Sequence, residues 1–169
     1  GTEFSKNFSK AYFDIRYSAF TEKNRHLDVR IYGGIIFNNN TTGYYFIFGL
    51  DISNDYMFKL HYIGNSEDSG IFSQQFIIDD GVFKSVLPVR FANQWMLSFN
   101  SSIGMWRWIE VYNDVAFLKS RNQSIYLAYE NGIRFNFVHR ILEVYFPLYS
   151  NNGWELGQPQ YSEKIRFTL

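Results

Sequence analysis

The sequence has no cysteine among its 169 residues, only 3 prolines, and no long run of apolar residues. The missing thiols exclude disulfide frameworks and thiolate metal sites. No stretch approaches the roughly 18 consecutive apolar residues of a transmembrane helix, and the chain does not open with the charged and then apolar pattern of a signal peptide. We therefore expect either a mature or excised piece of an exported protein, or a protein that is not exported.

The chain also has no excess of charge of either sign. Lys and Arg together number 16, and Asp and Glu together number 16. Without a net positive field, the chain has no general attraction for nucleic acid or for an anionic surface. We expect no nucleic-acid partner.

Aromatic side chains, by contrast, are abundant, with 18 Phe, 13 Tyr and 4 Trp. Aromatic residues suit the pleated surface of a strand, and Tyr and Trp also suit a place that is dry at one end and wet at the other. A bilayer interface is such a place, and outer-membrane barrels carry aromatic girdles at both rims. The composition therefore favours a β-protein that meets a membrane.

Apolar and polar residues alternate along the chain with a period of two. From Ala11 to Ala19 the odd positions are apolar, while the even positions include Asp14 and Arg16. This alternation predicts a strand with one apolar and one polar face. Similar segments recur at 27–37, 44–50, 56–62, 72–78, 95–105, 109–117, 125–137, 142–148 and 165–169. We expect about ten strands in an antiparallel up-and-down barrel that forms a single domain over residues 1–169.

Polar turns separate these segments. Only Trp106-Arg107 and Val138-His139 lie between neighbouring strands at two points, which predicts tight hairpins there. Residues 79–92 and 150–161 contain Gly and Pro. The first stretch predicts an extended loop, or strand ends that project beyond a membrane, and the second predicts a loop. Because connections alternate between rims, we expect both long loops on one rim and the tight hairpins on the other, which in outer-membrane barrels is the periplasmic one.

The two faces decide between a soluble and a membrane barrel. The apolar face is almost purely aliphatic and aromatic, whereas the polar face mixes acids and bases. A membrane barrel turns the apolar face toward lipid and the polar face inward, where neighbouring opposite charges would neutralise one another. The expected inward network comprises Asp14, Arg16, Asp28, Arg30, Lys59, Glu110, Asp114, Glu130, Arg134, Glu143, Lys164 and Arg166. We expect pairs within single strands: Asp14 with Arg16, Asp28 with Arg30, and Glu130 with Arg134.

Short stretches spread over nearly the whole chain resemble a known barrel region. They are Lys23–Arg30, Gly70–Gln75, Ala92–Leu97, Trp106–Glu110, Glu143–Tyr149 and Lys164–Phe167. They are similar to the C-terminal outer-membrane-type β-barrel region of aminopeptidase-N-like (gluzincin) metallopeptidase-related proteins of the Bacteroidetes. The resemblance implies that a peptidase-like part lies upstream, with this chain as the C-terminal part of a larger protein and its strands as part of a larger barrel.

No residue of a peptidase site can be assigned here. The zinc motif His-Glu-x-x-His is missing, because His26, His61 and His139 are not followed by Glu. His139 and Glu143 have a helical zinc spacing, but on a strand they would lie about 13 Å apart. The inward carboxylates share their face with Arg and Lys, which favours structural ion pairs over acid–base catalysis. We expect no catalytic, cofactor or metal site.

Three functions fit a barrel of this kind. The first is a non-catalytic barrel that anchors or scaffolds a larger protein or complex in the bacterial outer membrane. Its partners would be outer-membrane lipid and other outer-membrane or periplasmic proteins. The second is a narrow pore or transporter, although ten strands leave little space once long charged side chains fill the interior. The third is a soluble lipocalin-like ligand-binding barrel, which would need its apolar face inside.

Overall fold

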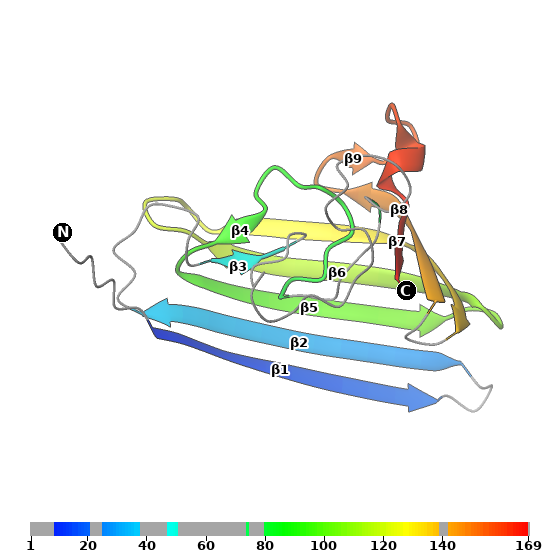
Figure 1. Ribbon diagram of the computed structural model, residues 1–169, viewed down its shortest axis with the longest axis horizontal. Helices are drawn as coiled ribbons and strands as arrows, with labels where there is room; N and C mark the ends of the chain where they lie inside the picture. Colours follow the sequence, from blue (N-terminus) through cyan, green and yellow to red (C-terminus); the bar gives the residue numbers. More distant parts are fainter. Residues whose placement is uncertain are drawn as a thin grey trace, which may run out of the picture.

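The computed structural model describes residues 9–20, 25–37, 47–50, 74, 80–138 and 142–168. These residues form an antiparallel sheet curled into a half-barrel, and they contain no α-helix (Figure 1). The order across the sheet is β1 (Ser9–Phe20), β2 (His26–Phe37), β5 (Trp95–Gly104), β6 (Ile109–Lys119), β7 (Tyr126–Val138), β8 (Leu142–Ser150) and β10 (Arg166–Thr168). The expected all-β class and antiparallel arrangement are confirmed.

Short elements complete the described part. A second sheet pairs β3 (Phe48–Gly49) with β4 (Phe91–Ala92), and β9 (Gly153–Trp154) pairs with the end of β8. A 3₁₀ turn, η2 (Tyr161–Lys164), precedes β10. The small sheet lies on the concave side of the large one (Figure 1).

The tight hairpin predicted at Trp106-Arg107 is confirmed. It joins β5 to β6, and the backbone N–H groups of Met105 and Trp106 donate to the Ile109 carbonyl at 2.8 and 3.0 Å. The register from Trp95↔Lys119 to Gly104↔Glu110 is unbroken. The second predicted hairpin is only partly visible, because β7 ends at Val138 and residues 139–141 lie outside the described part.

The predicted up-and-down order fails between β2 and β5. These two strands pair directly, from Leu27↔Ile103 to Ile35↔Trp95, although three strands were expected between them. The apolar pairs Leu27↔Ile103, Ile31↔Phe99 and Ile35↔Trp95 lie on one face, and the polar pair Arg30↔Asn100 lies on the other, so the faces of the two strands agree. The expected segment 56–62 lies outside the described residues, as does 72–78 apart from residue 74. Of the segment 44–50, residues 47–50 are described, and their strand β3 lies outside the main sheet.

Residues 80–90, named here the inserted segment, form a loop without helix or strand, which agrees with the first of the two alternatives for 79–92. The predicted position at the rim is wrong, because the segment lies against the concave face of the main sheet (Figure 1). The N–H of Phe83 donates to Leu50 O at 2.9 Å, and Leu50 N–H donates to Arg90 O at 2.8 Å. Phe83 and Leu87 are buried with Phe48 and Leu50 in the apolar core. The segment is drawn inward because its apolar side chains gain burial and its backbone finds partners.

The two faces of the sheet differ as the alternation predicted. In β5, Leu97, Phe99 and Ile103 are exposed on the convex face, whereas Ser98 and Asn100 are buried on the concave face. The convex side chains exposed to a similar degree include Phe13, Ile15, Ile35, Phe37, Phe117, Leu127 and Phe137. The apolar face therefore points away from the interior of the half-barrel.

The two edges of the described sheet run in the same direction. Seven strands alternate antiparallel from β1 to β10, so the first and the last have equal sense. β1 is 12 residues long and β10 only three. If β1 and β10 met directly, they would form a parallel pair in an otherwise antiparallel sheet. An all-antiparallel closure needs an odd number of further strands between them.

Candidate functional site

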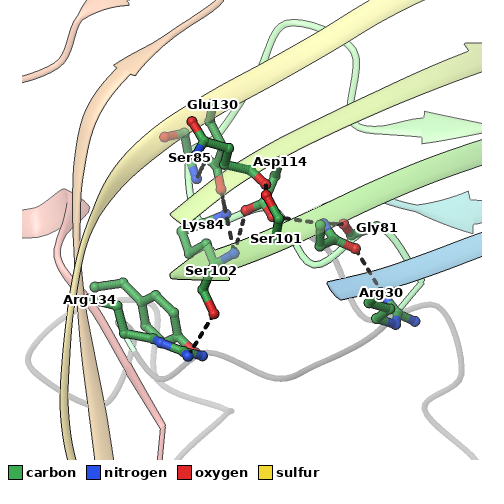
Figure 2. Close-up of polar contacts among 12 residues, drawn as sticks. Arg30, Gly81, Lys84, Ser85, Ser101, Ser102, Asp114, Glu130 and Arg134 are labelled. Carbon is green, nitrogen blue, oxygen red and sulfur yellow. Dashed lines mark hydrogen bonds and ion pairs between the residues drawn. The ribbon is translucent and has the colours of Figure 1, made fainter. Parts of the chain in front are cut away.

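A lysine that the sequence analysis missed stands at the centre of the concave face. The side chain of Lys84, on the inserted segment, is only 4% exposed. Its ammonium group donates to Asp114 of β6 and lies 3.9 Å from Glu130 of β7. Figure 2 shows these three residues meeting between the inserted segment and the sheet. The ammonium also lies 4.5 Å from the ring centroid of Tyr112 and 5.2 Å from that of Tyr145, within the range of cation–π attraction.

Glu130 binds the inserted segment through its backbone as well. Its two carboxylate oxygens accept hydrogen bonds from the N–H groups of Lys84 and Ser85, each at 2.7 Å. A buried carboxylate is stable only when charge and hydrogen bonds compensate its lost hydration. Because Lys84 and Ser85 both belong to the inserted segment, Glu130 holds that segment against β7.

A second cluster surrounds Arg134 of β7. Its Nε donates to Glu110 at 3.0 Å, and one terminal nitrogen donates to Asp28 at 3.2 Å. The other terminal nitrogen lies 3.5 Å from Glu143. The Tyr145 hydroxyl donates to the same Glu143 carboxylate. Arg134, on β7, therefore connects carboxylates from three other strands, β2, β6 and β8.

A third cluster lies nearer the β1 edge. Arg30 of β2 donates through Nε to Asp14 at 2.9 Å and through a terminal nitrogen to the Asp80 carbonyl at 2.8 Å. Arg16 donates to the same Asp14 carboxylate at 2.8 Å, but its side chain is 55% exposed. Lys10 approaches the Asp80 carboxylate at 3.5 Å. Arg30 thus connects the inserted segment with β1.

Asn100 of β5 links the Lys84 and Arg30 clusters. Its amide nitrogen donates to Asp114 at 2.9 Å and to the Gly81 carbonyl at 3.0 Å, and its amide oxygen accepts from Arg30 at 3.4 Å. Figure 2 shows Lys84 with Asp114 and Glu130, and Arg134 bonded separately to Ser102. The Arg134 cluster adjoins Lys84 through Tyr145, whose hydroxyl donates to Glu143 and whose ring centroid lies 5.2 Å from the Lys84 ammonium.

The expected pairing within strands is only partly right. Asp14 does bond to Arg16, but Arg30 takes Asp14 rather than Asp28. Arg134 bonds to Asp28 and Glu110 rather than to Glu130, whose partner is Lys84. Side chains two residues apart on one face are about 7 Å apart, whereas directly opposed residues on neighbouring strands are about 5 Å apart. Partners across strands are therefore closer.

Two expected members lie at the end of the sheet rather than in its middle. Lys164 ends the turn η2 instead of belonging to the last strand, and it binds the buried Glu155 at 2.6 Å. Arg166 begins β10 and donates through Nε to the Lys84 carbonyl at 3.2 Å. Asn152 donates to the Val86 carbonyl at 3.0 Å, so this end also contacts the inserted segment. Lys59 lies outside the described residues.

Three buried charged residues were not predicted to lie in the interior: Asp80, Lys84 and Glu155. Asn100, Ser102, Tyr112 and Tyr145 follow the predicted alternation onto the polar face, and the structure adds them to the interior contacts. The signal for Lys84 was present, since it is the only charge in the apolar run from Val82 to Leu87. A lone cation flanked by buried apolar residues needs a buried acid. Which acid it meets depends on how a distant segment folds over the sheet.

A cavity of about 330 Å³ remains beside the inserted segment. Its lining includes Arg16, Arg30, Lys84, Tyr112 and Arg134. Among the described residues, no group of three or more His, Asp or Glu could hold a metal ion. The charges that line the cavity are directed at one another, so the arrangement serves to hold the inserted segment in place.

Comparison with known proteins adds no relative. No family model, curated protein or solved structure matches the chain. In the described part of the chain, no helix has the length and apolar character needed to cross a membrane. The resemblance to the barrel region of gluzincin-related proteins stays a prediction.

Proposed function

We propose that this chain is a non-catalytic β-barrel, or part of one, that anchors a larger protein or complex in a bacterial outer membrane. The observation that carries the proposal is the facing of the sheet. Large apolar side chains such as Phe99, 44% exposed, cover the convex face, while Asp114 and Glu130 are buried on the concave face. This is the arrangement of a membrane barrel, whose wall meets lipid and whose interior is polar.

The same facing argues against a soluble lipocalin-like barrel. Such a barrel buries its apolar residues inside and exposes its charges, because water is outside. Here the exposed convex residues belong to five strands that are neighbours in the sheet, β1, β2, β5, β6 and β7. Soluble monomers rarely expose contiguous apolar patches larger than a few hundred Å². Strands of 9 to 13 residues also suit a tilted crossing of the hydrocarbon layer.

The inserted segment favours an anchor over a pore. It occupies the concave side and is held by Lys84, by two backbone N–H groups bound to Glu130 and by Arg30. Opening a path would require these buried groups to lose their partners together, which is costly. We propose that the interior is plugged.

Further strands complete the barrel in this proposal. β1 pairs on one edge only within the described residues, and both of its faces are largely exposed. Long open edges are points of aggregation in isolated sheets. A larger barrel in which an odd number of strands lies between β10 and β1 would cover that edge and keep every pair antiparallel.

The test uses the absence of native cysteine. Phe99→Cys and Leu127→Cys place a single thiol on the convex face, and Gln123→Cys places one in the exposed turn between β6 and β7 as a control. Each variant is spin-labelled and reconstituted into phospholipid vesicles. We expect the convex labels to collide with oxygen and to be shielded from an aqueous nickel complex, and the control label to show the reverse. Nickel access at both convex positions equal to that of the control would overturn the membrane assignment.

The non-catalytic part has its own measurement. The purified chain, folded in detergent, should show no peptidase turnover with or without added zinc. Zinc-dependent turnover would contradict the anchor assignment while leaving the membrane assignment intact.

A further inference from the structure

The hairpin between β5 and β6 exposes unusually large side chains. In residues 105–108, named here the tryptophan turn, Trp106 is 75% and Trp108 56% exposed, and Arg107 between them is exposed as well. The turn itself is ordered by backbone bonds from Met105 and Trp106 to Ile109 and by the Asn136 N–H, which donates to Trp108 O at 2.8 Å. The indoles are thus held at the rim by their backbone and are left uncovered by the rest of the described chain.

The neighbouring end of β1 and β2 has the same character. Phe20 is 71% exposed and its ring lies 4.3 Å from that of His26. Arg25 is exposed and directly precedes β2. A Cβ built on Gly104, at the end of β5, would lie 3.4 Å from the Arg25 Cα, so this end adjoins the tryptophan turn. Two arginines and three large aromatic residues therefore gather at one rim.

This combination has a specific chemical match. An indole is most favourably placed where its ring meets apolar chains and its N–H meets water. A guanidinium group presents paired N–H donors that fit a phosphate, and each cation near a membrane surface contributes about 1 kcal/mol of attraction to anionic lipid. The opposite turn between β6 and β7 has an exposed Arg121 but no aromatic residue among 120–125.

We propose that the tryptophan turn and the adjoining Arg25 form a binding site for the phosphate of an anionic glycerophospholipid headgroup, which positions this rim at the membrane interface. The inference rests on the proposed membrane function. Arg107 binds the phosphate, Trp106 and Trp108 flank it at the level of the headgroups, and Arg25 adds a second cation. The convex apolar face continues from this rim into the hydrocarbon layer.

The experiment measures preference for anionic lipid. The folded chain is placed in phosphatidylcholine vesicles, and brominated phosphatidylglycerol is titrated in while tryptophan quenching is followed. Arg107→Gln keeps all four tryptophans and should weaken the preference for phosphatidylglycerol about fivefold. Arg121→Gln removes the same charge from the opposite turn and should leave the preference unchanged.

Three results would overturn the site. Equal losses in the two variants would show an effect of net charge, and no loss in Arg107→Gln would show that the turn does not bind the headgroup. Competition by millimolar inorganic phosphate would show a site for the free ion. If the convex spin labels are shielded from nickel and any of these three results is found, only the headgroup site is rejected. Labels open to nickel would reject the membrane function itself.

Discussion

β1 and β6 have the same alternation of apolar and polar residues, yet their charges lie in different surroundings. In β1, the Asp14 and Arg16 side chains are partly or largely exposed. In β6, the Asp114 side chain is 1% exposed and pairs with Lys84. The difference comes from the inserted segment, which covers the concave face over β6 and β7. Among the described residues it contacts β1 through the pair of Lys10 with Asp80, and through Arg30 of β2, which bonds both Asp80 and Asp14. The alternation along a strand sets the face to which a charged side chain points. The inserted segment sets how much of that side chain is exposed to solvent.

That contrast has energetic consequences. A partly exposed ion pair contributes about 0–1 kcal/mol, because water and salt screen it. Removing one partner of a buried pair costs about 3–5 kcal/mol, because the remaining charge stays buried without compensation. Substitutions in the two regions should therefore differ severalfold, and the following predictions run from the largest effect to the smallest.

Lys84→Met should produce the largest loss, about 3–5 kcal/mol in the free energy of unfolding. The substitution leaves Asp114 and Glu130 without their cation. The measurement is urea unfolding in lipid vesicles, followed by tryptophan fluorescence. Lys10→Met is the matched control, since its pair with Asp80 is longer and more exposed. Equal losses of stability in the two variants would show that the inserted segment does not exclude water from the Lys84–Asp114 pair.

Phe99→Arg tests the convex face of the main sheet. Phe99 lies in the middle of β5 on the convex face, where a charge facing the midplane of a bilayer costs about 2–4 kcal/mol. Met105→Arg places the same charge at the rim and should cost about 0–1 kcal/mol. The readout is the folded fraction in vesicles. The same folded fraction in both variants would contradict the prediction that the cost of the charge depends on its depth in the bilayer.

Gly132→Ala should cost about 1–3 kcal/mol by overpacking. A Cβ at this position would lie 2.3 Å from the Phe146 carbonyl oxygen and 2.6 Å from the Tyr112 hydroxyl. The carbonyl belongs to β8, where the pairing with β7 already shifts register between Asn131 and Gly132. Gly157→Ala, with no atom within 4 Å of the new Cβ, is the control and should be neutral. The same urea titration separates the two.

Arg16→Gln should have the smallest effect, below about 1 kcal/mol, because its partner Asp14 retains Arg30. The unfolding midpoint should move little, and the small loss should shrink further in high salt. A loss comparable to that of Lys84→Met would mean that the β1 edge is as dry as the centre, as it would be if another strand covered it in the folded protein.

The sequence alone predicts which way the charged side chains of the candidate site point. It does not predict which partners they bind. The inward direction of Asp114, Glu130 and Arg134 follows from residues two apart sharing a face. Their partners do not follow, because Lys84 reaches them from a segment that was expected beyond the rim. Lys164 was misplaced because alternation continues by chance into the turn η2, where residues no longer share a strand.

Local features follow from the residues alone. The alternation of apolar and polar residues sets which side chains face out along β1, β2 and β5 to β8, and the break in that alternation at Trp106-Arg107 places the hairpin, whose turn spans residues 105–108. The pairing of β2 with β5 and the position of residues 80–90 inside the half-barrel arise in the folded structure. The two kinds of feature differ in the sequence distance between the residues that interact. Strand facing is set by bonded neighbours, whereas strand pairing and the burial of a charge depend on contacts between residues far apart in the chain.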